Sequence, residues 1–272
     1  MTATDPSFQN WQDLADTFNA LGWFLPAYIP GVHLAGLVDR VNTSPVAARQ
    51  KIFADGVCGL YPPRAMAAML LYRYQKCPFV RDFSAMIGEC IEASCYGFLR
   101  VATTGLAPVI EGIARAIAKD RDMGFTHRPT KLIRCVLKDL GERAIGAASP
   151  DADSELKLLV RSYTQFFDGR FWKDTDERPV GETLNRHGLL HGITIGEDFG
   201  TRYNFSRLLS VLDLFCLLVT YVSPRSEGLR VTFPSETEES KALAKYFGVA
   251  AMGRTAVLDR LPVRFGLGRN AE

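Results

Sequence analysis

The segment that decides the fold reads Leu208-Leu209-Ser210-Val211-Leu212-Asp213-Leu214-Phe215-Cys216-Leu217-Leu218-Val219-Thr220-Tyr221-Val222. It is the most apolar part of the chain, but it is only fifteen residues long and contains Asp213. A helix that spans a bilayer needs about 20 predominantly apolar residues. We therefore interpret this segment as a buried helix, the last long helix of the core, over 203–221.

The remaining sequence also has helical rather than strand-like spacing of its apolar residues. Helices are expected over 8–21, 44–54, 64–75, 79–99, 106–121, 129–140, 154–167, 180–190 and 235–247. Thr103-Thr104 is expected to cap one of them, with Pro108 in its first turn, and Ser235 with Glu238 forms a predicted capping box. Pro26 and Pro30-Gly31 are expected to break the chain, and 254–272 to be irregular or a short docking segment. The predicted fold class is all-α.

Composition sets broad limits on function. The 272 residues suffice for one large or two modest domains, and 47% hydrophobic and 23% charged residues are ordinary for a globular protein. A net charge of +2 means that any RNA binding must come from a local patch. No secretion signal or membrane span is predicted, and six cysteines without a CxxC pair favour reduced thiols over the alternative, a disulfide among the first four. We therefore expect a cytoplasmic protein.

The segment from Arg186 to Gly192, Arg-His-Gly-Leu-Leu-His-Gly, contains two of the four histidines. Arg186 can neutralise a phosphate, and His191 can move a proton on or off a ribose hydroxyl because an imidazole titrates near neutral pH. On an ideal helix these two residues lie about 140° apart. They can act on one phosphate if the helix end is distorted, which Gly188 favours, or if a second copy of the chain contributes.

Two other interpretations of the same residues stay open. His187 and His191 can be structural, because basic residues at a helix C-terminus interact favourably with its dipole and glycine commonly follows. Two histidines four apart are also half of a zinc site, although Gly188 stands where HExxH has its glutamate. The third zinc ligand would then come from Glu111, Glu197 or Asp198. No metal or cofactor is predicted, and no glycine-rich nucleotide-binding loop is present.

Three short patterns near the motif resemble the closing segment of HEPN-type proteins. They are Asn185-Arg186-His187-Gly188-x-Leu190-His191-Gly192, Phe199-Gly200-Thr201-x-x-Asn204 and Leu208-Leu209-x-x-Leu212-Asp213. Upstream, Leu106-Ala107-Pro108-x-x-Glu111-Gly112 is similar to the first-helix pattern of some members. The resemblance covers 103–223 and leaves 1–100 unassigned.

The resemblance implies a compact HEPN-like helical bundle that dimerises to form a cleft. Many members of the family are metal-independent endoribonucleases in stress, toxin–antitoxin or antiviral systems, and others are non-catalytic binding or dimerisation modules. In active members the arginine and histidine of the motif are catalytic, which corresponds here to Arg186 and His191. The polar residue after the arginine, His187, is expected to assist, and Asn185 to support the motif.

Glu111 is a separate expectation, because a carboxylate in an otherwise apolar helix is costly to bury alone. Its partner is either Arg186 or His191 across the bundle, or Arg115 one turn along the same helix. The sequence leaves these alternatives open.

The sequence thus predicts a HEPN-like core over 103–225, an additional N-terminal helical region over 1–100 that recognises a partner, ligand or substrate, and a C-terminal helix and tail over 226–272. The expected function is a metal-independent endoribonuclease, with RNA as substrate and a regulatory protein or nucleic acid as a further partner. A homodimer is expected because one motif makes an incomplete cleft and because 208–222 offers more apolar surface than a small bundle buries. The alternative is a non-catalytic module that binds a nucleotide or a protein in the same cleft.

Overall fold

The computed structural model describes residues 8–124, 129–169, 199–226, 229 and 232–265, and every regular element in these ranges is helical. The all-α class is therefore confirmed. The longer helices are α1 (Phe8–Ala20), α2 (Gly31–Asn42), α3 (Val46–Gly59), α4 (Pro63–Met69), α5 (Ser84–Cys95), α6 (Leu99–Asp120), α7 (Pro129–Ala147), α8 (Pro150–Gly169), α10 (Arg202–Val222) and α11 (Glu238–Phe265). A π-helical turn, η1 (Leu70–Tyr74), extends α4, and single 3₁₀ turns are η2 (Arg81–Phe83) and η4 (Pro224–Ser226).

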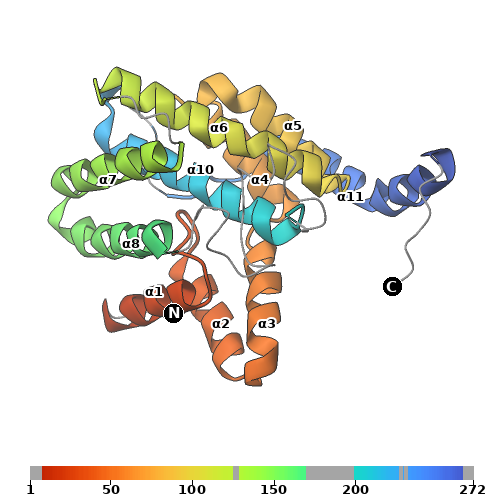
Figure 1. Ribbon diagram of the computed structural model, residues 1–272, viewed down its shortest axis with the longest axis horizontal. Coiled ribbons are helices and arrows are strands. Elements are labelled where there is room, and N and C mark those ends of the chain that lie inside the picture. Colours follow the sequence, from red (N-terminus) through yellow and green to blue (C-terminus); the bar gives the residue numbers. More distant parts are fainter. Residues whose placement is uncertain (1–7, 125–128, 170–198, 227–228, 230–231, 266–272) are drawn as a thin grey trace.

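Helix α10 is the central helix of the molecule, and all sixteen residues from 204 to 219 are buried. It packs against α3, α6 and α7 (Figure 1). The apolar run that suggested a core helix is therefore buried on all sides, as expected for a helix that is hydrophobic around its whole circumference. This burial also removes one reason for expecting a dimer, because the apolar surface of 208–222 is already covered within one chain.

Helices α6 and α10 run parallel to each other (Figure 1). Their N-terminal ends meet where Gly200 lies against Arg100, so closely that a Cβ on Gly200 would be 2.9 Å from the Arg100 backbone nitrogen. At the opposite ends, Arg225 forms a 3.2 Å ion pair with Asp120. The partial positive charges of two helix N-termini therefore lie at the same end of the bundle.

The N-terminal helices share their hydrophobic core with the rest of the chain, as one cluster of buried residues extends from Leu14 to Ala250. Arg207 on α10 is a buried link between these regions. Its guanidinium stacks on the rings of Trp23, Tyr203 and Phe166 and donates a 3.1 Å hydrogen bond to the carbonyl of Gly22. A planar, weakly hydrated guanidinium is well suited to such a stacked, buried position.

Helix α6 begins earlier than the sequence indicated, at Leu99, and Pro108 lies inside it rather than in its first turn. The side chain of Thr104 does not cap the helix but donates a 2.7 Å bond to the carbonyl of Arg100 in the preceding turn. The prediction of a Thr103-Thr104 cap was wrong. Helix α6 continues through Pro108, which is exposed, whereas its neighbours Ala107 and Val109 are buried.

Three further expectations were wrong, one in the N-terminal part of the chain and two in the C-terminal part. Helix α2 forms after Pro30, where only a chain break was expected, and it buries Leu34, Leu37, Val38 and Val41. Helix α11 continues to Phe265 through part of the segment expected to be irregular. Its capping pair is Thr237 and Ser240 instead of Ser235 and Glu238, since each of these two backbone N–H groups donates to the other residue's hydroxyl.

Helices α6 and α10 are long and apolar enough to cross a membrane by length and composition. In both, most of the apolar window is buried within the molecule, 61% for α6 and 83% for α10. Such burial is also found in the core helices of folded bundles.

Candidate functional site

The proposed catalytic motif lies outside the described residues. This applies to Asn185, Arg186, His187 and His191, and equally to Glu197 and Asp198, the alternative zinc ligands. Within the described ranges, no group of three or more His, Cys, Asp or Glu side chains is arranged to hold a metal ion. All six cysteines are described, and all are free thiols.

Glu111 is the one predicted site residue that the structure describes. Its carboxylate accepts hydrogen bonds from Nε and Nη2 of Arg115, at 3.1 Å and 2.6 Å. The side chain of Glu111 is only 12% exposed, whereas that of Arg115 is 39% exposed. The pair one turn along the helix is therefore present, and the alternative partners Arg186 and His191 lie outside the described residues.

The pattern Phe199-Gly200-Thr201-x-x-Asn204 fixes the start of α10. Thr201 is the N-cap, and its hydroxyl accepts a 3.1 Å hydrogen bond from the backbone N–H of Asn204. The Asn204 side chain donates a 3.0 Å bond back to the carbonyl of Phe199. Gly200 lies directly against the start of α6, where even a Cβ would collide with Arg100. The side chains of Thr201 and Asn204 and the missing side chain of Gly200 thus each have a structural role at the start of α10.

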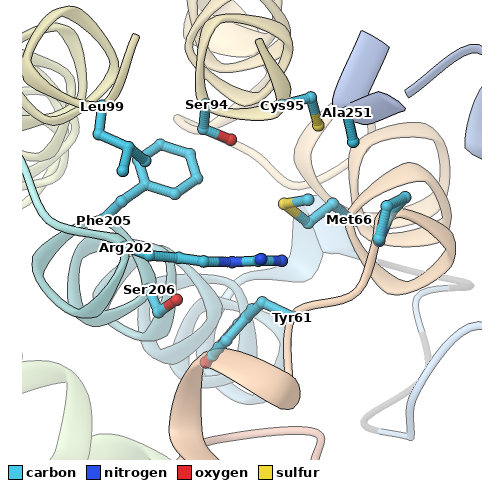
Figure 2. A pocket seen from close by; sticks show the side chains of 10 residues that line it. Tyr61, Met66, Ser94, Cys95, Leu99, Arg202, Phe205, Ser206 and Ala251 are labelled. Carbon is cyan, nitrogen blue, oxygen red and sulfur yellow. The ribbon is translucent and has the colours of Figure 1, made fainter. Parts of the chain in front are cut away.

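A pocket of about 150 Å³ opens at this same end of the bundle. It lies where α6 and α10 begin, where α5 ends and where α4 starts, with α11 closing one side (Figure 2). The residues that line it are Tyr61, Pro63, Met66, Ser94, Cys95, Leu99, Arg202, Phe205, Ser206 and Ala251. None of these ten residues is acidic.

Arg202 is the charged group of the pocket. Its side chain is extended, and the guanidinium reaches across the pocket between Met66 and Tyr61 (Figure 2). Arg202 is exposed and makes no hydrogen bond or ion pair with any residue that the structure describes. Burial raises the pKa of the Cys95 thiol, and the nearby Arg202 charge partly opposes this rise. Cys95 is therefore a neutral thiol that presents no competing negative charge.

Ser206 supplies a buried hydroxyl beneath Arg202. The residue is 1% exposed, and its hydroxyl oxygen has no full hydrogen-bond partner among the described residues. A side-chain interaction with Ser206 lowers the pKa of the Cys58 thiol, against the larger effect of burial, which raises it. The Ser206 hydroxyl lies on the pocket wall (Figure 2). A buried hydroxyl without a partner is costly unless a ligand or water satisfies it.

A second polar cluster lies deeper in the core, around Asp213. This carboxyl group accepts a 2.6 Å hydrogen bond from the Tyr74 hydroxyl, and the neighbouring Tyr61 and Ser210 hydroxyls are 2.5 Å apart. Burial raises the pKa of Asp213 to about 7, although the tyrosine hydroxyls and the Arg73 charge favour the ionised form. Asp213 itself is only 2% exposed, and within this cluster Tyr61 also lines the pocket.

Sequence reasoning did not single out the Arg202 pocket. Thr201 and Asn204 belonged to a recognised pattern, but nothing in the sequence distinguishes Arg202 from the other exposed arginines. The pocket exists because several helix ends meet, and its lining residues extend from Tyr61 to Ala251. The chain matches no protein-family model, no curated protein and no solved structure.

Proposed function

We propose that this chain is a cytoplasmic, metal-independent endoribonuclease of the HEPN type, acting in a stress, toxin–antitoxin or antiviral role. The observation that carries the proposal is the spacing of Arg186 and His191, followed in the sequence by the 199–204 pattern and an apolar core helix. The all-helical fold and the central position of α10 are compatible with a HEPN-like bundle, and they support the proposal to that extent.

The proposed motif precedes the start of α10 closely in the sequence. His191 precedes Phe199 by eight residues. An extended chain spans at most about 3.5 Å per residue, so the Cα atoms of these residues lie within roughly 28 Å of each other. Exposed Arg100 and Arg202 lie at the N-terminal ends of α6 and α10, where Gly200 contacts Arg100. Such a concentration of positive charge favours binding of a phosphate backbone nearby.

In the proposed mechanism, His191 acts as general base on the ribose 2′-hydroxyl or as general acid at the leaving 5′-oxygen. The 2′-oxygen attacks the adjacent phosphorus, the bond to the 5′-oxygen breaks, and a 2′,3′-cyclic phosphate remains. Arg186 stabilises the charge that develops on the phosphate. His187 orients the RNA or transfers the second proton. A homodimer would place two motifs across one cleft.

Incubation of the purified protein with mixed RNA, with and without EDTA, tests this proposal. Cleavage that survives EDTA and yields cyclic phosphate ends supports it, whereas cleavage lost with EDTA indicates a metal site. A complete lack of cleavage, also after trial activation with candidate protein or nucleic-acid partners, favours the non-catalytic module that binds a nucleotide or a partner protein.

A further inference from the structure

We propose that the Arg202 pocket is a binding site for a small monocarboxylate with a compact apolar body. This site is distinct in residues from the Arg186–His191 motif and goes beyond the proposed ribonuclease activity. It rests on three features of the described residues. They are an arginine without a partner, a buried hydroxyl without a full partner, and an apolar wall of limited volume.

The charged end of the ligand is specified by Arg202 and Ser206. A guanidinium presents its N–H groups as a planar fork that matches the two oxygens of a carboxylate. The Ser206 hydroxyl, 1% exposed, can donate to the same carboxylate, which would satisfy an otherwise unpaired buried group. The N-termini of α6 and α10 add partial positive charge at this end, and no acidic residue lines the pocket to oppose an anion.

The apolar end of the ligand is specified by the remaining walls. Met66, Leu99 and Phe205 line the pocket together with the Tyr61 ring and Ala251. The cavity measures about 150 Å³. A cavity of about this size in another protein accommodates one benzene molecule. The Arg202 pocket therefore suits one six-membered ring or a short branched chain that carries a single carboxylate.

The same walls argue against a polar anion such as a phosphate or a nucleotide. Phosphate-binding sites surround the oxygens with several N–H donors, often from a glycine-rich loop. Here one guanidinium and hydroxyl groups face thioether, aromatic and aliphatic carbon. A whole nucleotide is larger than the cavity, so its base and ribose would stay outside. A carboxylate with an apolar body can contact both parts of the pocket, its charged group the Arg202 guanidinium and its body the apolar walls.

Ligand-observed NMR titration with benzoate tests the proposal, with benzamide as the uncharged analogue of the same shape and inorganic phosphate as the polar anion. Benzoate should bind saturably and about tenfold or more tightly than benzamide, because the charged group gains a charge-assisted hydrogen bond. Equal binding of benzoate and benzamide, phosphate binding as tight as benzoate, or no saturable benzoate binding at millimolar concentration would each overturn the proposal.

Substitutions in the pocket test whether benzoate binds there. Arg202→Gln should weaken benzoate binding about tenfold or more and leave the affinity for benzamide unchanged. The matched control is Arg40→Gln, which removes an exposed arginine of α2 that does not line this pocket and should leave binding unchanged. Ala251→Leu fills the apolar side from α11 without changing charge, and it should weaken both ligands. Unchanged benzoate binding in Arg202→Gln, with a circular dichroism spectrum like the wild type, would contradict the assignment.

The result is separable from the ribonuclease proposal. His191→Ala should abolish RNA cleavage and retain benzoate binding, whereas Ala251→Leu, which changes no charge, should weaken benzoate binding and retain RNA cleavage. If the chain cleaves no RNA but binds benzoate through Arg202, only the ribonuclease proposal fails. If it cleaves RNA and does not bind benzoate, only the proposal of the carboxylate site fails.

Discussion

The hydroxyl of Tyr74 donates a 2.6 Å hydrogen bond to Oδ1 of Asp213, although the two residues are 139 positions apart in the sequence. Tyr74 closes the π-helical turn after α4, and Asp213 lies in the middle of α10. Their bond therefore joins the N-terminal helices to the central helix in an interior where Asp213 is 2% exposed. Neither group is free to exchange its partner for water.

This burial makes the stability of the fold depend on pH. The pKa of Asp213 is about 7 in the folded protein, against an ordinary value of 3.8. The folded state therefore holds a proton that the unfolded chain releases, and stability falls as pH rises from about 4 to about 7, by up to about 1.4 kcal/mol per unit. Asp213→Asn keeps a neutral acceptor for Tyr74 and should remove this contribution. Urea unfolding across the range measures it, and parallel stability curves for wild type and variant would contradict the assignment.

Two glycines of α7 should respond oppositely to alanine. A Cβ on Gly141 would lie 2.0 Å from the Tyr163 hydroxyl oxygen, which donates a 2.8 Å bond to the carbonyl of Leu137. Gly141→Ala should therefore cost about 1–3 kcal/mol through overpacking and loss of this buried hydrogen bond. Gly146 meets nothing within 4 Å, so Gly146→Ala should stabilise by roughly 0.5–1 kcal/mol. Thermal unfolding distinguishes them, and equal shifts would show that α7 and α8 pack less closely here.

The pair of Glu111 and Arg115 tests whether Glu111 has a further functional partner. A partly exposed pair one turn apart is worth about 0.3–1 kcal/mol, so Arg115→Ala should cost no more than this. We expect Glu111→Ala to cost more, because its carboxylate is the more deeply buried member and we propose that it also meets Arg186 or His191. Chemical denaturation of both variants provides the comparison. Equal losses would assign Glu111 to the Arg115 pair alone.

The catalytic motif predicts an order among three variants. His191→Ala and Arg186→Ala should abolish cleavage, and Arg186→Ala should also reduce the salt dependence of RNA binding by about one unit because one phosphate contact is lost. His187→Ala should be milder, since positioning is its assigned role. Cleavage rates and salt titrations measure this order, with circular dichroism as the control for folding. If His191→Ala unfolds the protein, the histidine is structural and the catalytic interpretation is wrong.

We expect a homodimer because the proposed cleft needs the motifs of two copies of the chain. The apolar surface of α10 gives no such reason, since it is covered within its own chain. Static light scattering at micromolar concentration should give about twice the chain mass of 30.1 kDa. A strict monomer with intact ribonuclease activity would show that a single motif with a distorted helix end suffices.

The sequence alone determined the elements whose character is local. The run from 208 to 222 is apolar on every side of a helix, so its burial follows from composition alone. Helix α2 carries an equally local signal, since Leu34, Leu37, Val38 and Val41 recur at helical spacing. Pro30 and Gly31 do not break the chain here, because proline is compatible with the position just before the first helical turn and α2 begins directly after it.

Tertiary structure decided the features that join distant parts of the chain. Pro108 lies inside α6 although proline usually breaks or kinks a helix interior, and its neighbours Ala107 and Val109 are buried in the core. The bond of Tyr74 with Asp213 and the pocket around Arg202 require particular helix ends to meet. The spacing of side chains along one helix is a local property that a sequence displays directly. Which helix ends converge depends on how all the apolar faces bury one another together, and that is fixed only when the whole core packs.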